Sequence, residues 1–356
     1  RRDRAEGGGS GAGAAGAAGR GDATGATGRG DATGATAAAN AANAADVRKA
    51  AALRQQVEAR LGGGAPLDGL DLAGADLSGL DFSHRSLAKV DLSGARLTGC
   101  RFVKASLAGA QMAGAELTDA VLDGADLTRA DLTGARLTRA SLAGARLEET
   151  ELSRVDAEGA TFREVQAPRS RFEGAALQKA RFEGASLEGA DLGSAALDEA
   201  AFARATLRGA RLYDAKGRKA SFEEAVLEET RMDGAVLPQC SFRGARAAGS
   251  TWDRALLDGS RFDGATLGQA SFVKASLEGA SLAGVELTDG RLARARLAGS
   301  TLARANLMRA NLEAADLTDA DLTGANLHGA ETWKAKLPRV RLEGAIVTQS
   351  KLAERS

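Results

Sequence analysis

The sequence predicts a solenoid, a fold in which a short repeated unit coils many times around one narrow core. Two observations carry this prediction. A large apolar residue, most often Leu or Phe, returns at every fifth position from Leu67 to Leu352, and the register of five never slips. The residue two positions earlier is small and nearly always Ala, as at Ala75 and Ala95. Neither a helical period of 3.6 nor a strand period of 2 keeps step with a strict period of five.

Composition supports the same fold class. A chain of 356 residues ordinarily holds two or three globular domains, but only 4% of this one is aromatic. Such a chain suits a narrow, repetitive core. The 47 basic and 47 acidic residues cancel, so charge predicts no general attraction to nucleic acid or to an anionic membrane. No apolar run is long enough to cross a bilayer and no signal peptide is visible, so we expect a cytoplasmic protein.

Residues 1–45 are predicted to be a disordered tail or linker. Gly, Ala, Thr and Asn with scattered charge cannot bury enough surface to offset the entropy of ordering. A nonapeptide occurs twice, at 19–27 and 28–36. Its Arg20-Gly21-Asp22 triplet matches a cell-adhesion tripeptide, and its Gly and Asp spacing is similar to that of calcium-binding nonapeptides. The linker interpretation is favoured, because chance explains the triplet and the calcium pattern lacks its required order.

Residues 46–64 are predicted to form a short helix and a glycine turn. Asp46 is a suitable N-cap, and the three glycines at 62–64 end the helix. One face of the helix is apolar and consists of Leu53, Val57 and Leu61. We expect this helix to cap the solenoid, because an uncovered first coil would expose backbone groups to edge-to-edge pairing.

Residues 65–356 resemble the pentapeptide repeat family, whose consensus is A(D/N)LXX. Ala125-Asp126-Leu127-Thr128-Arg129 and Ala305-Asn306-Leu307-Met308-Arg309 are close matches. The resemblance implies an all-β fold, a right-handed quadrilateral parallel β-helix in which four pentapeptides form one coil. In that fold the large apolar residue in the middle of each pentapeptide, here called the central residue, points inward. The small residue two positions before it also points inward. The register holds (352 − 67)/5 + 1 = 58 units, so we expect about 14 coils without a protruding loop.

A coil of twenty residues sorts the core into four columns. Eight of the ten Phe residues share one phase and predict a stacked aromatic column: Phe82, Phe102, Phe162, Phe182, Phe202, Phe222, Phe242 and Phe262. Phe172, Trp252 and Phe272 fall on the opposite side. Five central positions lack a large apolar residue and predict thin or distorted places in the core: Ala157, Ala167, Gly217, Ala247 and Thr332.

No arrangement of residues predicts catalysis. The two His residues, His84 and His328, fall on outward turn positions about twelve coils apart, so they cannot share a catalytic or metal site. Cys100 and Cys240 lie 140 residues apart on one side, too far for a disulfide, and replace Ala in the core. We therefore predict a protein that is not an enzyme, with no catalytic, cofactor-binding or metal-binding residues and no cofactor.

The best-known activity of the family that the chain resembles is mimicry of duplex DNA, by which some members bind DNA gyrase. An alternative function is therefore that of a DNA mimic, which binds DNA gyrase or another DNA-binding protein. Nine basic and six acidic residues precede residue 65, so the repeats hold 38 basic and 41 acidic residues. Duplex DNA carries one negative charge per ~1.7 Å. One outward column instead alternates in sign, through Asp76, Arg96, Glu116, Arg136 and Asp156, and acidic residues cluster only in the first coils, at Asp68, Asp71, Asp76, Asp81 and Asp91.

The favoured function is a rigid, non-enzymatic scaffold or protein–protein interaction module of bacterial origin. Its protein partner is unknown, and we expect no direct binding to nucleic acid. Three outward features are candidate contact surfaces: the apolar pair Val236 and Leu256, the segment from Tyr213 that carries Lys216, Arg218 and Lys219, and the single residue Trp333. Neutral variation on a tolerant surface is the alternative for each.

Two further expectations concern the ends of the chain. Repeats of this kind resemble the C-terminal arms of larger proteins found with contractile, type VI-like secretion systems, and the absence of an initiator Met agrees with an upstream attachment. We also expect that the last coil can pair end to end with a second copy, which would give a homodimer.

Overall fold

The computed structural model describes residues 48–350, so the predicted linker and the N-cap Asp46 lie outside the described residues. A helix spans 48–63, and Gly64 follows it with a φ of +71°. The amides of Gly64 and Ala65 donate to the carbonyls of Leu61 and Arg60 at 3.4 and 3.0 Å, which is a Schellman motif. The helix therefore ends two residues later than expected, because only the residue after the helix needs a positive φ.

The apolar face of this helix packs against the first repeats. Val57 is fully buried, and Leu53 and Leu61 are partly buried against the same core. The Arg54 guanidinium donates to the carbonyl of Ser78 at 3.1 Å. From the repeats, Arg85 donates to the carbonyl of Ala65 at 2.6 Å. The helix is thus fixed to the first coil by both burial and hydrogen bonds to backbone carbonyls.

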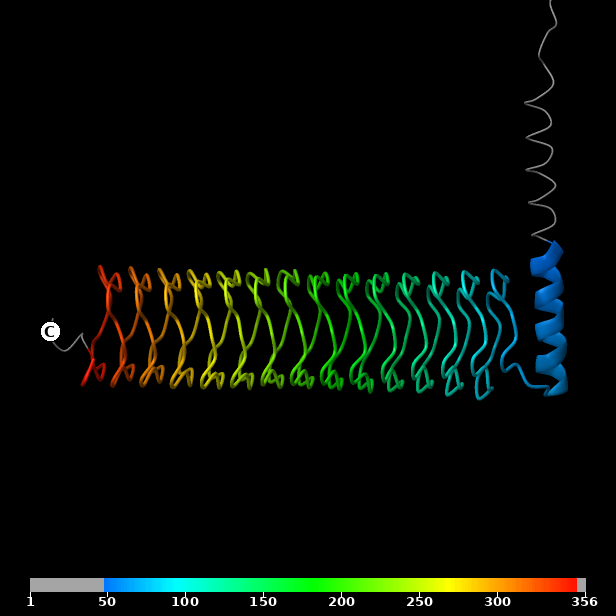
Figure 1. Cartoon of the computed structure of the whole chain (residues 1–356), viewed down its shortest axis with the longest axis horizontal. Helices are drawn as coiled ribbons and strands as arrows, with labels where there is room; N and C mark the ends of the chain where they lie inside the picture. Colours follow the sequence, from blue (N-terminus) through cyan, green and yellow to red (C-terminus); the bar gives the residue numbers. More distant parts are fainter. Residues whose placement is uncertain (1–47, 351–356) are drawn as a thin grey trace, which may run out of the picture. The chain divides into compact units, whose positions relative to one another are not determined.

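The repeats form a parallel β-helix with twenty residues per coil (Figure 1). Each pentapeptide contributes one bridging residue, which pairs in parallel with the residue twenty positions later. The ladder begins with Asp71 and Asp91 and runs without interruption to Asn326 and Ile346. Four such sides make one coil. Within 65–350 no strand is longer than a single bridging residue, because a turn follows each bridge within two residues.

Almost every side ends in the same turn. The amide of Ala75 donates to the carbonyl of Leu72 at 3.0 Å, and this bond recurs along the repeats. The second residue after each central residue has a positive φ at all positions from Gly69 to Gln349. Gly fills fewer than half of these positions, and residues such as Lys274, with a φ of 61°, fill the others. The turn and the packed core impose this backbone even where a side chain opposes it.

The turn explains the Asp or Asn of the consensus. In 65–350 the amide of the residue directly after the central one donates to no backbone carbonyl. Where the residue two positions earlier is Asp or Asn, its side chain often accepts this amide, as Asp131 does from Thr133 at 2.8 Å and Asn306 from Met308 at 3.3 Å. Three prolines occupy this position without losing a bond: Pro168, Pro238 and Pro338. The outward Asp or Asn thus completes the backbone hydrogen bonding of its own unit.

The core consists of the central residues and the small residues two positions before them, almost all of them fully buried. The predicted Phe column is confirmed. Phe202 stacks on Phe182 with ring centroids 4.7 Å apart and on Phe222 at 4.8 Å. The aromatic residues of the opposite side meet this column edge-on, as Trp252 meets Phe242 at 5.0 Å.

The prediction of distorted places at the small central residues was wrong for the three alanines. Ala157 and Ala167 flank the edge-to-face pair of Phe162 and Phe172, and Ala247 lies between Phe242 and Trp252 in sequence. All three are fully buried and keep their turn hydrogen bonds. Two opposed aromatic rings fill the narrow interior, so the neighbouring sides need only a methyl group.

Gly217 is a true irregularity. Its carbonyl accepts no turn hydrogen bond from the amide of Ala220. It instead accepts a hydrogen bond from the thiol of Cys240, one coil later, with Sγ 3.1 Å from the carbonyl oxygen. A Cβ on Gly217 would lie 2.8 Å from Leu197 Cβ, so the backbone of this side sits directly against the preceding coil.

Ser250 satisfies the polar atom of the largest core residue. The indole N–H of Trp252 donates to Ser250 Oγ at 2.7 Å, and the Ser250 hydroxyl donates to the carbonyl of Ala247 at 2.6 Å. Ser170 has the same position before Phe172 and donates to the carbonyl of Ala167 at 2.7 Å, but no ring donates to it. The two serines therefore differ in one hydrogen bond.

Ser250→Ala should lower the free energy of unfolding by about 1–2 kcal/mol, because it leaves a buried indole N–H without an acceptor. Ser170→Ala is the matched control and should cost less than about 0.5 kcal/mol. Denaturant unfolding followed by circular dichroism measures both changes. Equal losses in the two variants would contradict the role of the Trp252 bond.

The two cysteines are buried and not bonded to each other, as predicted. Burial raises the pKa of Cys100 to about 11 and the pKa of Cys240 to about 12. At pH 8 neither thiol of the folded protein should react with an aromatic disulfide reagent, whereas both should react in denaturant. Since unfolded thiols ionise near a pKa of ~8.5, the contribution of the two thiols to stability should be constant below that pH and should fall as the pH rises toward 11. Two reactive thiols in the folded protein at pH 8 would contradict this burial.

Candidate partner surface

The structure places both His residues on turns, as predicted. His84 is exposed and has a φ of 61°, and His328 Nδ1 lies 2.8 Å from Thr348 Oγ1. Within 48–350, no group of three or more His, Cys, Asp or Glu side chains is arranged to hold a metal ion. None of the helices described there has the length and apolar character needed to cross a bilayer.

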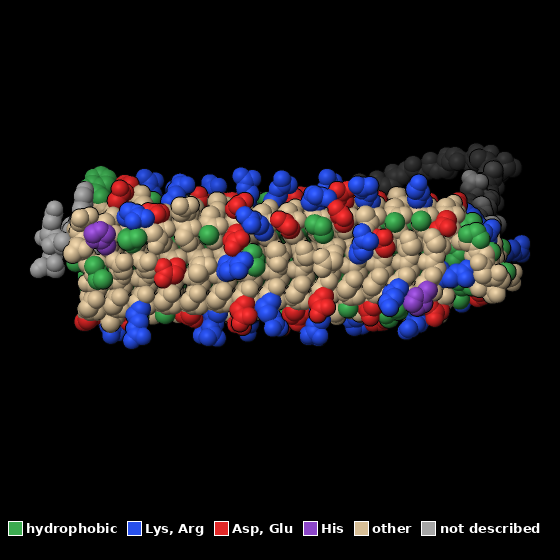
Figure 2. Space-filling view, turned by 90° about the horizontal axis from the view of Figure 1, so that it is seen from below, with side chains coloured by type: hydrophobic (Ala, Val, Ile, Leu, Met, Phe, Trp, Pro, Cys, Tyr) green, Lys and Arg blue, Asp and Glu red, His purple; other side chains and the backbone are tan. Residues whose placement is uncertain are grey.

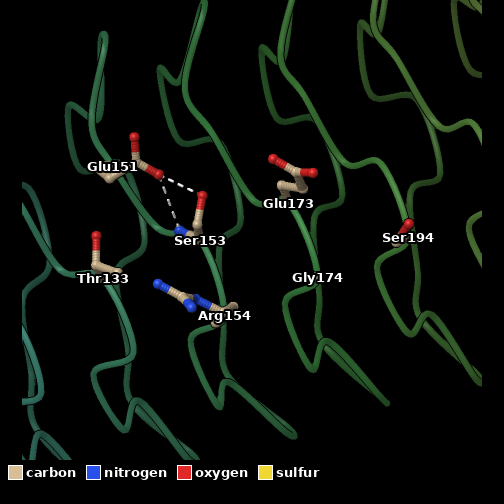
Figure 3. Close-up of a pocket in the computed structure, with 7 residues that line it drawn as sticks. All are labelled: Thr133, Glu151, Ser153, Arg154, Glu173, Gly174 and Ser194. Atoms are coloured by element: carbon tan, nitrogen blue, oxygen red, sulfur yellow. Dashed lines mark hydrogen bonds between the residues drawn. The ribbon is translucent and has the colours of Figure 1, made fainter.

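A corner of the solenoid carries a depression of about 580 Å³ (Figure 3). The amide and hydroxyl of Ser153 donate to Glu151, and Glu151 also pairs with Arg171 at 3.2 Å. This Ser–Glu contact repeats the bonds of Thr133 to Asp131 one coil earlier. It is therefore the ordinary turn bond of the repeat, not a catalytic dyad. The depression is lined by Thr133, Glu151, Ser153, Arg154, Glu173, Gly174 and Ser194.

The structure brings all seven candidate residues to one side of the solenoid. This side, here called the Lys216 face, consists of residues 213–219 and the equivalent residues at intervals of twenty up to 333–339. Parallel bridges join Lys216 to Val236 and Val236 to Leu256, so these three are consecutive in one outward column. In the sequence they are separate features. The face carries Tyr213, Lys216, Arg218, Lys219, Val236, Leu256 and Trp333.

The middle of the Lys216 face carries two apolar side chains in its outward column. Leu256 is 43% exposed although it has a large aliphatic side chain, and Val236 beside it is half-buried. Small or ring-closed residues flank the pair at the corners: Gly234, Pro238 and Gly259. Ser276 continues the column but is buried, because its hydroxyl donates to Asp258 at 2.5 Å. The exposed apolar strip is thus limited to Val236 and Leu256.

Tyr213 lies flat at the corner of this face. A Cβ on Gly193, one coil earlier, would be 2.4 Å from the Tyr213 ring, so the absence of a side chain at 193 makes room for the ring. The ring is half-buried, and this burial raises the pKa of the Tyr213 hydroxyl. Gly193 was missed on the sequence, although its glycine at an otherwise ordinary turn position, twenty residues before the only Tyr, is a usable signal.

Trp333 lies at the same corner six coils later and is 49% exposed. The ammonium of Lys334 sits 3.8 Å from the centre of its ring, a cation–π contact. Leu337, Leu342 and Val347 in this last described coil are only partly buried, whereas the central residues of the preceding coils are fully buried.

The alternating charge column forms ion pairs, as its sign pattern predicts. Arg96 lies 3.3 Å from Asp76 and 3.8 Å from Glu116, and Arg136 lies 3.7 Å from Asp156. Basic and acidic side chains are interspersed along the visible face of the repeats (Figure 2). Neighbouring opposite charges largely cancel the field at a distance.

A family comparison agrees with this geometry. The family model for pentapeptide repeats matches overlapping segments that together cover residues 65–352. The chain belongs to the pentapeptide repeat family. Members of this family form right-handed quadrilateral β-helices, and the twenty-residue register of the bridges agrees with that architecture. No curated protein matches the chain.

Solved pentapeptide repeat proteins are similar to this one in sequence pattern. HetL, from a Nostoc cyanobacterium and involved in the regulation of heterocyst differentiation, is 25% identical, with 82% of this chain and 95% of HetL covered and a TM-score of 0.22. QnrB1, a plasmid-mediated fluoroquinolone resistance protein, is 19% identical over 53% and 92% of the two chains, with a TM-score of 0.34. Rfr23, from the cyanobacterium Cyanothece, is 29% identical, with 27% of this chain and 62% of Rfr23 covered and a TM-score of 0.22. The repeat match, not these superpositions, assigns the family.

Proposed function

We propose that this pentapeptide repeat protein is a non-enzymatic interaction module that binds a partner protein through the Lys216 face. One observation carries the proposal. Seven outward residues that depart from the repeat pattern share one side of the solenoid, among them an exposed Leu256 and an exposed Trp333. Four of the seven are close in sequence, so the agreement of this segment with Val236, Leu256 and Trp333 is what supports the proposal; the third exposed large apolar residue within 48–350, Ile346, lies on the opposite side. Exposed apolar and aromatic residues are also the side chains that contribute most to protein–protein contacts.

The fold suits this function. The tract of about fourteen coils, capped by the helix 48–63, holds outward side chains at intervals of ~4.8 Å along each side. Its backbone hydrogen bonds and stacked core leave these side chains on a rigid support, so little ordering entropy opposes binding. Attachment to a larger, secretion-associated protein and end-to-end pairing through the last coil stay predictions.

Affinity capture from the organism that encodes the protein tests the proposal. The wild-type chain should retain a protein that a Leu256→Ser, Trp333→Ser double variant loses. A variant with Val226→Ser and Thr266→Ser, on the opposite side, should retain it. Capture that is equal for the two variants would contradict the use of the Lys216 face.

Mimicry of DNA is the alternative function, and the first coils favour it most. Asp68, Asp71 and Asp81 lie there. Their carboxylates, however, already accept hydrogen bonds from Ala88, Ala73 and Ser83 amides at 2.8, 3.1 and 2.8 Å. A gyrase supercoiling assay separates the two functions. We expect no protection or inhibition at micromolar protein, and either effect would favour mimicry.

A further inference from the structure

The Lys216 face also carries a cluster of cations that lack carboxylate partners. Within 48–350, no carboxylate lies within 4.0 Å of the charged groups of Lys216, Lys219, Arg254, Lys274 or Arg294. Elsewhere on the repeats many basic residues pair one coil away, as Arg309 pairs with Asp289 at 2.7 Å. Others, such as Arg204 and Arg304 on the opposite side, also have no carboxylate within 4.0 Å among the described residues. Positive charge is therefore available on this side of the solenoid in four of five successive coils.

Most of the described acidic residues of the same region accept hydrogen bonds from the repeats, and the two that do not, Asp214 and Glu199, lie more than 4.0 Å from the charged groups of the five cations. Asp198 accepts the amide of Arg218 at 2.6 Å. Asp253 accepts the amide of Val273 at 3.0 Å, and Asp258 accepts the amide of Glu278 at 2.9 Å. Glu278 pairs with Arg296. These carboxylates complete turns and neighbouring pairs, so they do not neutralise the five cations.

The cations surround the apolar strip. Lys216 precedes Val236 in the outward column, and Lys219 stands at the corner of the same coil. Arg254, Lys274 and Arg294 follow one another along the other corner, beside and beyond Leu256. The whole arrangement covers five coils, and the four spacings between them amount to roughly 19 Å at the distance between neighbouring strands.

We infer that this surface binds an acidic segment of a partner protein that also carries apolar side chains, an inference that rests on the proposed function and names the partner's chemistry. Carboxylates would meet the five cations, and an aliphatic or aromatic side chain would cover Val236 and Leu256. A duplex nucleic acid fits less well. Its backbone offers phosphates but nothing apolar for the strip, and five coils with carboxylates between the cations match its dense charge poorly.

A defined probe tests this inference. A fluorescein-labelled peptide of about 14 residues, composed of Glu, Asp, Leu and Phe, covers the strip if helical at ~1.5 Å per residue. Fluorescence anisotropy should show saturable binding to the full chain that weakens with added salt. A peptide with Ser in place of Leu and Phe should bind at least about fivefold more weakly, and a DNA duplex of equal charge should not compete.

Charge reversal locates the site. Lys216→Glu, Lys219→Glu and Lys274→Glu together should weaken binding at least about tenfold. Glu is compatible with these positions, because Glu116 occupies an equivalent outward position and Glu199 has a φ of 58° at an equivalent turn. The matched control is Arg146→Glu, Arg204→Glu and Arg304→Glu. It changes one outward and two turn positions on the opposite side by the same charge, and should weaken binding less than about threefold.

Several results would overturn the inference. They are the absence of saturable binding, equal loss in the two reversed variants, equal binding of the Ser-containing peptide, and competition by the duplex. None of these results alone contradicts the proposed function, because a partner captured from cells could still depend on Leu256 and Trp333. Loss of that dependence would contradict the proposed function itself.

Discussion

Phe202→Ala should lower the free energy of unfolding by about 3–5 kcal/mol, the usual cost of removing a buried ring from a packed core. Phe202 is fully buried and loses two stacking contacts, to Phe182 at 4.7 Å and to Phe222 at 4.8 Å. Because each coil rests only on its neighbours, the cavity cannot be filled from elsewhere. Guanidinium unfolding followed by circular dichroism measures the change.

Phe202→Leu is the control for this prediction. Leu122 and Leu142 occupy the same column and are fully buried, so the repeat accommodates Leu at this phase. The Leu variant should lose about 1–2 kcal/mol of unfolding free energy, which is clearly less than the loss in the Ala variant. If Phe202→Ala cost less than about 1 kcal/mol, the stacked column would not be a main source of stability.

Gly217→Ala should destabilise the protein by about 2–3 kcal/mol, although Ala fills many other buried positions of this chain. The added Cβ would lie 2.8 Å from Leu197 Cβ and 3.0 Å from the Leu197 carbonyl carbon, so the backbone of one coil must move. Such a shift would also disturb the bond from the Cys240 thiol to the Gly217 carbonyl. Cys240 should therefore react with a thiol reagent faster than Cys100 in this variant.

Gly268→Ala is the matched substitution. A Cβ there meets no atom within 4 Å, and the residue lacks a positive φ, so stability should stay within about 0.5 kcal/mol of the wild type. Equal effects at Gly217 and Gly268 would contradict the close approach of the two coils.

The columns of the fold were predictable from the sequence because a strict period fixes every phase. Twenty residues per coil predicted the stacking of Phe182 on Phe202, the alternation of Asp76 with Arg96, and the separation of the cysteines. Each of these depends only on which residues share a phase. The same arithmetic would have placed Val236, Lys216 and Trp333 on one side had the three features been compared by phase.

What the sequence did not predict depends on volume and on individual hydrogen bonds. Ala157 and Ala167 were predicted to distort the core, but the rings of Phe162 and Phe172 meet across the interior and fill it. The bond from Trp252 to Ser250 requires a rotamer that no periodicity specifies. The sequence predicts the candidate surface only as separate features. It does not show which cations lack a carboxylate partner, because that depends on which donors the nearby carboxylates bind.

Site-specific photo-crosslinking tests the central claim most directly. A photoreactive phenylalanine analogue is placed at Leu256 on the Lys216 face, or at Thr266, an exposed outward position half a coil later on the opposite side. In the cells that encode the protein, the variant at 256 should give a discrete crosslinked product that the variant at 266 lacks. Crosslinking at 266 alone, or equal products at both positions, would contradict binding through the Lys216 face.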